Sequence, residues 1–202
     1  MGKKRDESVR RLTAFVPAVL LMALIFFFSA QPSEESSVTS EFIGVKLFTE
    51  ANFLFGFGWD LDKIYLMSED AQHAIRKAAH FTEYLVLGIA LIHGFRINFP
   101  AGTMRARQAY GRWGLCSLLF GSLYAASDEI HQCFIPGRYG AAGDAMIDCA
   151  GVLTGILLAL CAVAWREKRR QRKAMRRNGT AVYPGTEPDA AQGSNAGIVE
   201  VR

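Results

Sequence analysis

The sequence has 202 residues, enough for one domain, and half of them are hydrophobic. The formal net charge is +4. The charged residues lie in blocks between long apolar runs, a pattern that excludes an ordinary water-soluble domain and indicates a membrane protein. Eight of the twelve residues at 166–177 are Lys or Arg. Because this block directly follows an apolar run, it indicates contact with anionic membrane lipids and argues against a nucleic acid partner.

The first predicted element is a membrane-spanning helix over residues 12–30, a run of 19 residues without charge. That length suffices to cross a hydrocarbon core about 30 Å thick. A cleaved signal peptide is the alternative, because basic residues precede the run. The run is longer than a usual signal sequence, and the bulky Phe28 stands three residues before a cut after Ala30. We therefore favour an uncleaved anchor.

The next segments are expected to lie outside the membrane. Residues 31–40 are polar and predict a linker, whereas residues 41–57 mix Phe, Leu and Ile with charges. The second pattern predicts an amphipathic helix on the outer membrane surface. Ser68 is a plausible N-cap because Glu69 and Asp70 follow it, so the next long helix is expected to begin there.

Three further apolar runs predict three more spans, at about 80–95, 113–127 and 148–165. The predicted fold is thus an all-α polytopic membrane protein, a bundle of four transmembrane helices over residues 12–165. A short cytoplasmic segment, residues 1–11, precedes the bundle, and a cytoplasmic tail over residues 166–202 follows it. The tail is basic at first and then rich in Gly, Ala and Pro, a composition typical of disorder.

The loop charges predict the orientation, because Lys and Arg favour the cytoplasmic side of a membrane. Residues 1–11 carry five basic and two acidic side chains, and residues 31–79 carry four and eight. Residues 96–112 carry four basic and no acidic side chains, and residues 128–148 carry one and four. The basic excess alternates at every crossing, which predicts a plasma-membrane protein with both termini in the cytoplasm.

Polar residues of types that are rare in membranes gather at the outer ends of the last three predicted helices. Most of them are spaced so that they share a helix face. They are Lys77, His80 and Tyr84 on the second span, Asp128, Glu129 and Gln132 on the third, Arg138 in the next loop, and Asp144 and Asp148 on the fourth. Arg76 and His73, nearby, are expected to be an interfacial anchor and an incidental residue.

Their depth suggests that three of these side chains meet. Counted at about 1.5 Å per residue from the basic residue at the cytoplasmic end of each helix, His80, Asp128 and Asp148 lie about 24, 24 and 27 Å along. These distances place all three at or just inside the outer boundary of the hydrocarbon core. Ionisable groups there usually face a bundle interior or a water-filled cavity. The sequence therefore predicts a recessed polar pocket that opens outward.

The candidate residues fall into two groups. His80, Asp128, Glu129 and Asp148 are the candidate catalytic or ion-binding set, because His beside carboxylates provides general acid/base groups. Lys77, Tyr84, Gln132, Arg138 and Asp144 are the candidate ligand-binding set, in which Lys77 and Arg138 contact an anion. A divalent cation would suit the first group, but the chain has no HExxH metal motif and no G-x-S-x-G nucleophile motif. Cofactor use and catalysis therefore stay open, and a purely structural network is the alternative.

Two further patterns concern packing. Gly151 and Gly155 are four residues apart, and small residues at this spacing allow close packing of membrane helices. The four cysteines show no metal-binding spacing. A disulfide between Cys133 and Cys149 is conceivable.

These motifs, in this order, resemble the VanZ-like family of bacterial membrane proteins. The family pattern is Lys-x-x-His-x-x-x-Tyr, then Asp-Glu-x-x-Gln, Pro-Gly-Arg and Asp-x-x-x-Asn followed by glycines. Here it reads KAAHFTEY, DEIHQ, PGR and DAMIDCAGVLTG, and the FFFSAQPS that ends the first span is also similar to the family. One departure is Asp148, where the pattern often has Asn.

The resemblance implies an envelope protein rather than a defined reaction. The namesake of the family is an accessory factor in resistance to the glycopeptide teicoplanin. The expected partners are accordingly membrane lipids, a lipid-linked cell-wall precursor or a glycopeptide. A non-catalytic scaffold and a small transporter are the alternatives, although a transporter is less favoured because the chain shows no internal repeat.

Overall fold

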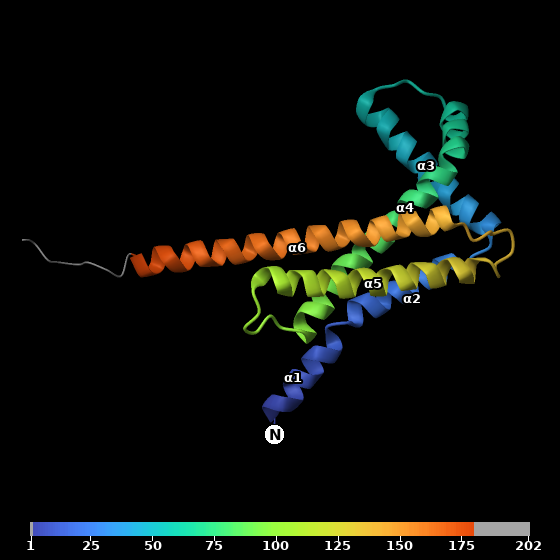
Figure 1. Ribbon diagram of the computed structural model, residues 1–202. Coiled ribbons are helices and arrows are strands. Elements are labelled where there is room, and N and C mark those ends of the chain that lie inside the picture. The colour runs from blue at the N-terminus through green and yellow to red at the C-terminus, as the bar shows by residue number, and fades with distance from the viewer. Residues whose placement is uncertain (1, 180–202) are drawn as a thin grey trace, which may run out of the picture. The chain divides into compact units, whose positions relative to one another are not determined.

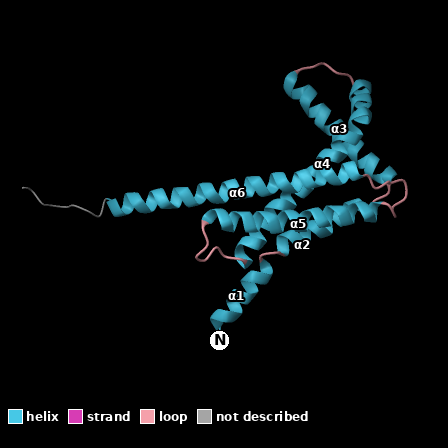
Figure 2. Ribbon diagram, in the orientation of Figure 1, coloured by secondary structure: helices cyan, strands magenta, loops and turns pink. Residues whose placement is uncertain are grey.

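In the computed structural model, which describes residues 2–179, every regular element of that range is a helix (Figures 1 and 2). In chain order the helices are α1 (Gly2–Thr13), α2 (Val16–Ser29), α3 (Ser33–Phe55), α4 (Leu61–Asn98), α5 (Ala106–Gln132) and α6 (Ala142–Gly179). The contacts divide the chain into two units, Met1–Val163 and Ala164–Arg202, and the site described below lies in the first. The predicted all-α class is confirmed, and most of the predicted disordered tail lies outside the described residues.

Three helical stretches of the described chain are long and apolar enough to cross a membrane, namely Asp6–Ser29, Leu61–Asn98 and Gly143–Arg176. The first comprises most of α1 and all of α2, which a turn at residues 14–15 separates, so the first predicted span is not one continuous helix. They contain the first, second and fourth predicted spans, apart from Ala30 at the end of the first. The third predicted span lies within α5, which is helical over 27 residues. α5 carries several Ser and Gly residues and an acidic pair near its end and is not among the three. Four crossings, and an orientation with both termini inside, stay predictions.

The segment after the first span is helical much earlier than expected. α3 begins at Ser33, so the linker predicted at 31–40 is wrong for most of its length. Glu34 and Glu35 lie in the first turn, where negative charge stabilises the positive end of the helix dipole. The helix predicted at 41–57 is present as far as Phe55, and Gly56, with φ of 66°, ends it in the left-handed conformation that glycine adopts readily.

α4 also begins earlier than predicted. The side chain of Asp60 accepts a hydrogen bond from the Lys63 backbone N–H at 2.9 Å and caps the helix, which therefore starts at Leu61. Ser68 is not the cap. Its hydroxyl is buried and donates to the Glu41 carbonyl of α3 at 2.8 Å. This bond joins α3 to the first part of α4, and the two helices lie side by side in Figure 1.

The predicted close packing at the glycines of α6 is confirmed. A Cβ on Gly151 would lie 2.5 Å from the Phe81 carbonyl oxygen of α4, and one on Gly155 would collide with the Leu85 carbonyl. Gly88 of α4 likewise faces the Val152 backbone. α4 and α6 therefore touch almost backbone to backbone. Buried apolar side chains fill the space around this contact, among them Leu87, Leu91, Trp113, Val152 and Ile156.

All four cysteines are free thiols. The conceivable bond between Cys133 and Cys149 is therefore not formed. Cys133 lies exposed just after α5, and its thiol donates to the Glu129 carbonyl of its own helix at 3.4 Å. Cys149 is partly buried on α6.

Candidate functional site

Three helices each bring one ionisable side chain to the same point. These are His80 of α4, Asp128 of α5 and Asp148 of α6, and one nitrogen or carboxylate oxygen of each lies within 4.8 Å of the other two. Asp128 is 3% exposed and Asp148 is 2% exposed, whereas His80 is partly buried. The glycine contact at Gly151 lies one turn from Asp148 and holds α4 and α6 close enough for the three to meet. We call these three residues the His–Asp trio.

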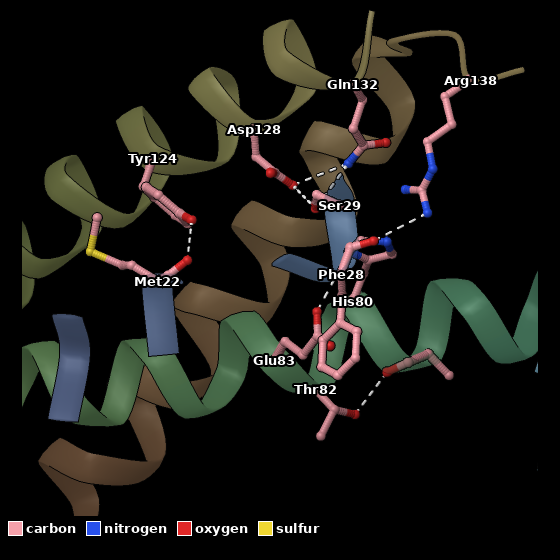
Figure 3. A network of polar contacts seen from close by, with 11 residues as sticks. Met22, Phe28, Ser29, His80, Thr82, Glu83, Tyr124, Asp128, Gln132 and Arg138 are labelled. Carbon is pink, nitrogen blue, oxygen red and sulfur yellow. Dashed lines mark hydrogen bonds and ion pairs between the residues drawn. The ribbon is translucent and has the colours of Figure 1, made fainter. Parts of the chain in front are cut away.

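Asp128 is held by two neutral donors (Figure 3). The Ser29 hydroxyl donates to Asp128 Oδ2 at 2.8 Å, and the Gln132 side-chain amide donates to the same oxygen at 3.1 Å. The other carboxylate oxygen, Oδ1, is buried and has no hydrogen-bond partner within the described residues. The sequence predicted Gln132 beside Asp128 but missed Ser29. The available signal was a serine at the end of the first apolar run, at the level of the other polar groups.

Three further side chains surround the His–Asp trio, namely those of Glu83, Tyr84 and Tyr124. Glu83 Oε2 lies 3.7 Å from His80 Nδ1, an ion-pair separation that is too long for a hydrogen bond. Tyr84 is fully buried, with its ring 6.1 Å from the ring of Tyr124. The Tyr124 hydroxyl donates to the Met22 carbonyl at 2.6 Å and links α5 to α2 (Figure 3).

A cavity of about 230 Å³ adjoins the His–Asp trio. Of the nine residues predicted for the site, all line this cavity except Tyr84 and Asp128, which are both buried. Six residues that the sequence did not place in the site also line it, namely Ser33, His73, Arg76, Gly137, Tyr139 and Ile147. The predicted helix from Ser68 already included His73 and Arg76, but the sequence analysis gave neither of them a role in the site.

The basic side chains of the cavity differ in how they are neutralised. Lys77 Nζ lies 2.8 Å from Asp144 Oδ1 and forms an ion pair across α4 and α6. Arg76 instead contacts the ring of His73, with Nη2 at 3.2 Å from Nδ1. Arg138 donates from Nη2 to the Phe28 carbonyl at 3.4 Å (Figure 3). No carboxylate in the described part of the chain lies within ion-pair distance of either arginine.

Arg138 combines partial burial with an unused donor. Its Nε is buried and has no hydrogen-bond partner among the described residues. Burial, and then the nearby charge of Arg76, lower the pKa of the Arg138 guanidinium. An arginine stays charged even so. The Glu129 carboxylate, which also lines the cavity, accepts from the Ala141 backbone N–H at 2.9 Å and so fixes the loop on which Arg138 stands.

Together these observations define an all-helical membrane protein with a polar cluster between three of its helices. A scan against family models matches residues 14–164 to the family described as VanZ/LLP1, a range that includes every residue of the site. The chain belongs to the VanZ/LLP1 family, as its motifs predicted. Searches of curated proteins and of solved structures found no match.

Proposed function

We propose that this VanZ-like protein resides in the bacterial plasma membrane, with its cavity facing outward, and binds the anionic headgroup of an envelope lipid or lipid-linked cell-wall precursor. The observation that carries the proposal is the pair of arginines at the cavity, Arg76 and Arg138, which lack a carboxylate partner in the described chain. A guanidinium binds phosphate or carboxylate through parallel hydrogen bonds. The buried Nε–H of Arg138 has no hydrogen-bond partner among the described residues and can donate to such an anion.

The size of the cavity favours one part of such a ligand. Sites for drug-sized molecules usually measure about 300–1,000 Å³. The 230 Å³ found here suits a phosphate-sized headgroup and is too small to enclose a whole glycopeptide antibiotic. An effect on teicoplanin susceptibility would then act through the bound lipid or precursor.

A structural role is the second candidate, and one observation favours it. The bonds from Ser29 and Gln132 to Asp128 join α2 to α5, and the Lys77–Asp144 pair joins α4 to α6. Such a network fixes helix packing without any ligand. It does not account for the two arginines, which have no carboxylate within ion-pair distance among residues 2–179.

The first experiment measures headgroup retention directly. The purified protein is reconstituted in nanodiscs that contain phosphatidylglycerol and phosphatidylcholine, and the lipids that stay bound are counted by native mass spectrometry. Arg138→Gln is expected to lower phosphatidylglycerol retention roughly 10-fold or more, because a hydrogen bond to a charged group contributes about 1.5–3 kcal/mol. Arg107→Gln, a matched loss of an exposed arginine at the start of α5, is the control. Equal retention in both variants would count against the proposal.

The second experiment tests the function in cells. His80→Ala and Asp128→Ala are introduced separately, and membrane levels of each protein are confirmed by immunoblot. The envelope-lipid profile and the glycopeptide susceptibility are then compared with wild type and with a deletion strain. Variants that match the deletion strain at normal protein levels support a working site. Variants that behave as wild type, where the deletion strain does not, refute it.

A further inference from the structure

We propose that His80, Asp128 and Asp148 bind a divalent transition-metal cation, Zn²⁺ or Mn²⁺, at the buried end of the cavity. This site goes beyond the binding of a headgroup by the arginines, since it can exist without any lipid. It also uses residues that the arginines do not contact.

The first argument is geometric. Ligand atoms that share one tetrahedral ion at about 2.1 Å lie roughly 3.4 Å apart. One atom from each of His80, Asp128 and Asp148 already lies within 4.8 Å of the other two, so small side-chain rotations bring them to bonding distance. The three residues come from three helices, and the glycine contact of α4 with α6 fixes their spacing. The site is therefore preformed by the fold.

The second argument is the charge. Asp128 and Asp148 are both almost fully buried and are close to each other. Neither carboxylate has a lysine or arginine within ion-pair distance in the described part of the chain. Buried carboxylates of the same charge are costly unless they are paired, protonated or bound to a metal. A divalent cation neutralises both at once.

The third argument is the unused oxygen of Asp128. Ser29 and Gln132 both donate to Oδ2, which fixes the orientation of the carboxylate. Oδ1 is left buried and without a hydrogen-bond partner among the described residues. Outer donors that orient a carboxylate in this way are the usual support of a metal ligand. Oδ1 is therefore available to a metal ion, and the buried Tyr84 hydroxyl, which also has no hydrogen-bond partner among the described residues, is the protein donor that competes for it.

The donors indicate which metals fit. Imidazole favours Zn²⁺ and related ions over Mg²⁺ and Ca²⁺, and carboxylates suit Mn²⁺ as well as Zn²⁺. A carboxylate beside the second ring nitrogen of a ligating histidine is common, and Glu83 lies 3.7 Å from His80 Nδ1. His80 and Asp148 also line the cavity, so an ion there has a side open to an incoming anion.

The test counts metal in the purified protein. Wild type is prepared without chelator, dialysed against Zn²⁺ or Mn²⁺ and then against metal-free buffer, and analysed by inductively coupled plasma mass spectrometry. We expect about one ion per chain. Asp148→Asn and His80→Ala should weaken metal affinity more than about 100-fold, since even supporting residues contribute 10–100-fold. Asp70→Asn is the matched control, because it removes an exposed carboxylate of α4 that does not line the cavity.

Size-exclusion chromatography of each variant shows whether it is folded, and wild type alone can decide the matter. Substoichiometric metal in wild type, with no binding of Zn²⁺ or Mn²⁺ by calorimetry, would overturn the inference and leave a shared proton between the two carboxylates as the explanation. Metal lost equally in Asp70→Asn would also overturn it. In the supporting case, chelation lowers the thermal unfolding temperature of wild type but leaves that of Asp148→Asn unchanged. None of these readouts depends on lipid binding, so failure of the proposed function is seen separately.

Discussion

The contact between α4 and α6 has two regions that are built in different ways. In the first, around Gly88, Gly151 and Gly155, the backbones touch and apolar side chains fill the surroundings. In the second, one turn away, His80 and Asp148 face Asp128 in a partly hydrogen-bonded cluster. The apolar region sets how closely the helices approach, and the polar region takes its geometry from that approach. The comparison suggests that the stability of the bundle resides in the first region and its specific chemistry in the second.

The strongest challenge to this comparison is a side chain placed in the apolar region. Gly155→Val should cost about 3 kcal/mol or more, because the new Cβ would overlap the Leu85 carbonyl and the backbone cannot easily move. Folded yield and unfolding in a detergent titration measure this. Gly143→Val on the same helix has open space around it and should stay within about 0.5 kcal/mol of wild type. A well-folded Gly155→Val protein would show that the close contact is dispensable.

A smaller effect is expected when the polar region loses one donor. Ser29→Ala should cost about 1.5–3 kcal/mol, because a buried carboxylate loses its 2.8 Å hydrogen bond. The same unfolding measurement applies. Ser127→Ala, which removes an exposed hydroxyl that bonds only within its own helix, serves for comparison and should change stability by less than about 0.5 kcal/mol. Equal effects in the two variants would mean that the Asp128 cluster does not hold α2 to α5.

The bond between Tyr124 and Met22 tests the link from α5 to α2 outside the cluster. Tyr124→Phe should cost about 1 kcal/mol, since it removes a neutral hydrogen bond of 2.6 Å and retains the ring. Thermal unfolding of the detergent-solubilised protein is the measurement. Tyr139→Phe, at a side chain that is 90% exposed, should have no measurable effect. A loss much larger than that of Ser29→Ala would reverse the ranking of neutral and charged bonds.

The smallest effect is expected at the rim of the cavity. Lys77 and Asp144 are 36% and 40% exposed, so their 2.8 Å ion pair should contribute less than about 1 kcal/mol. A double-mutant cycle of Lys77→Ala and Asp144→Ala gives the coupling energy. A coupling above about 2 kcal/mol would show that the rim, and not only the glycine contact, determines how α4 and α6 pack.

The sequence predicted the helical class and the meeting of His80 with Asp128 and Asp148, because hydropathy and the rise of a helix are simple one-dimensional rules. It failed where helices begin. Asp60 is the N-cap of α4, a position that the sequence predicted for Ser68, and Ser68 instead packs against α3. Capping chemistry alone does not distinguish a serine that starts a helix from one that fastens two helices.

The sequence also missed the contributions that depend on contacts between distant segments. Ser29 and Asp128 are 99 residues apart, and Arg138 reaches the Phe28 carbonyl across 110 residues. No local pattern pairs them. Ser29 and the Phe28 carbonyl therefore join the site from the end of α2, a segment whose apolar run shows only that it can enter a membrane.

One backbone contact limits how this architecture can vary. The Ser33 N–H at the start of α3 donates to the Pro136 carbonyl at 3.3 Å, and Gly137, with φ of 73°, passes so close that a Cβ there would lie 3.0 Å from the Ser33 Cβ. The short turn that joins α2 to α3 is therefore tied to the loop that carries Arg138. Insertion or deletion of a residue in that turn would displace the arginine.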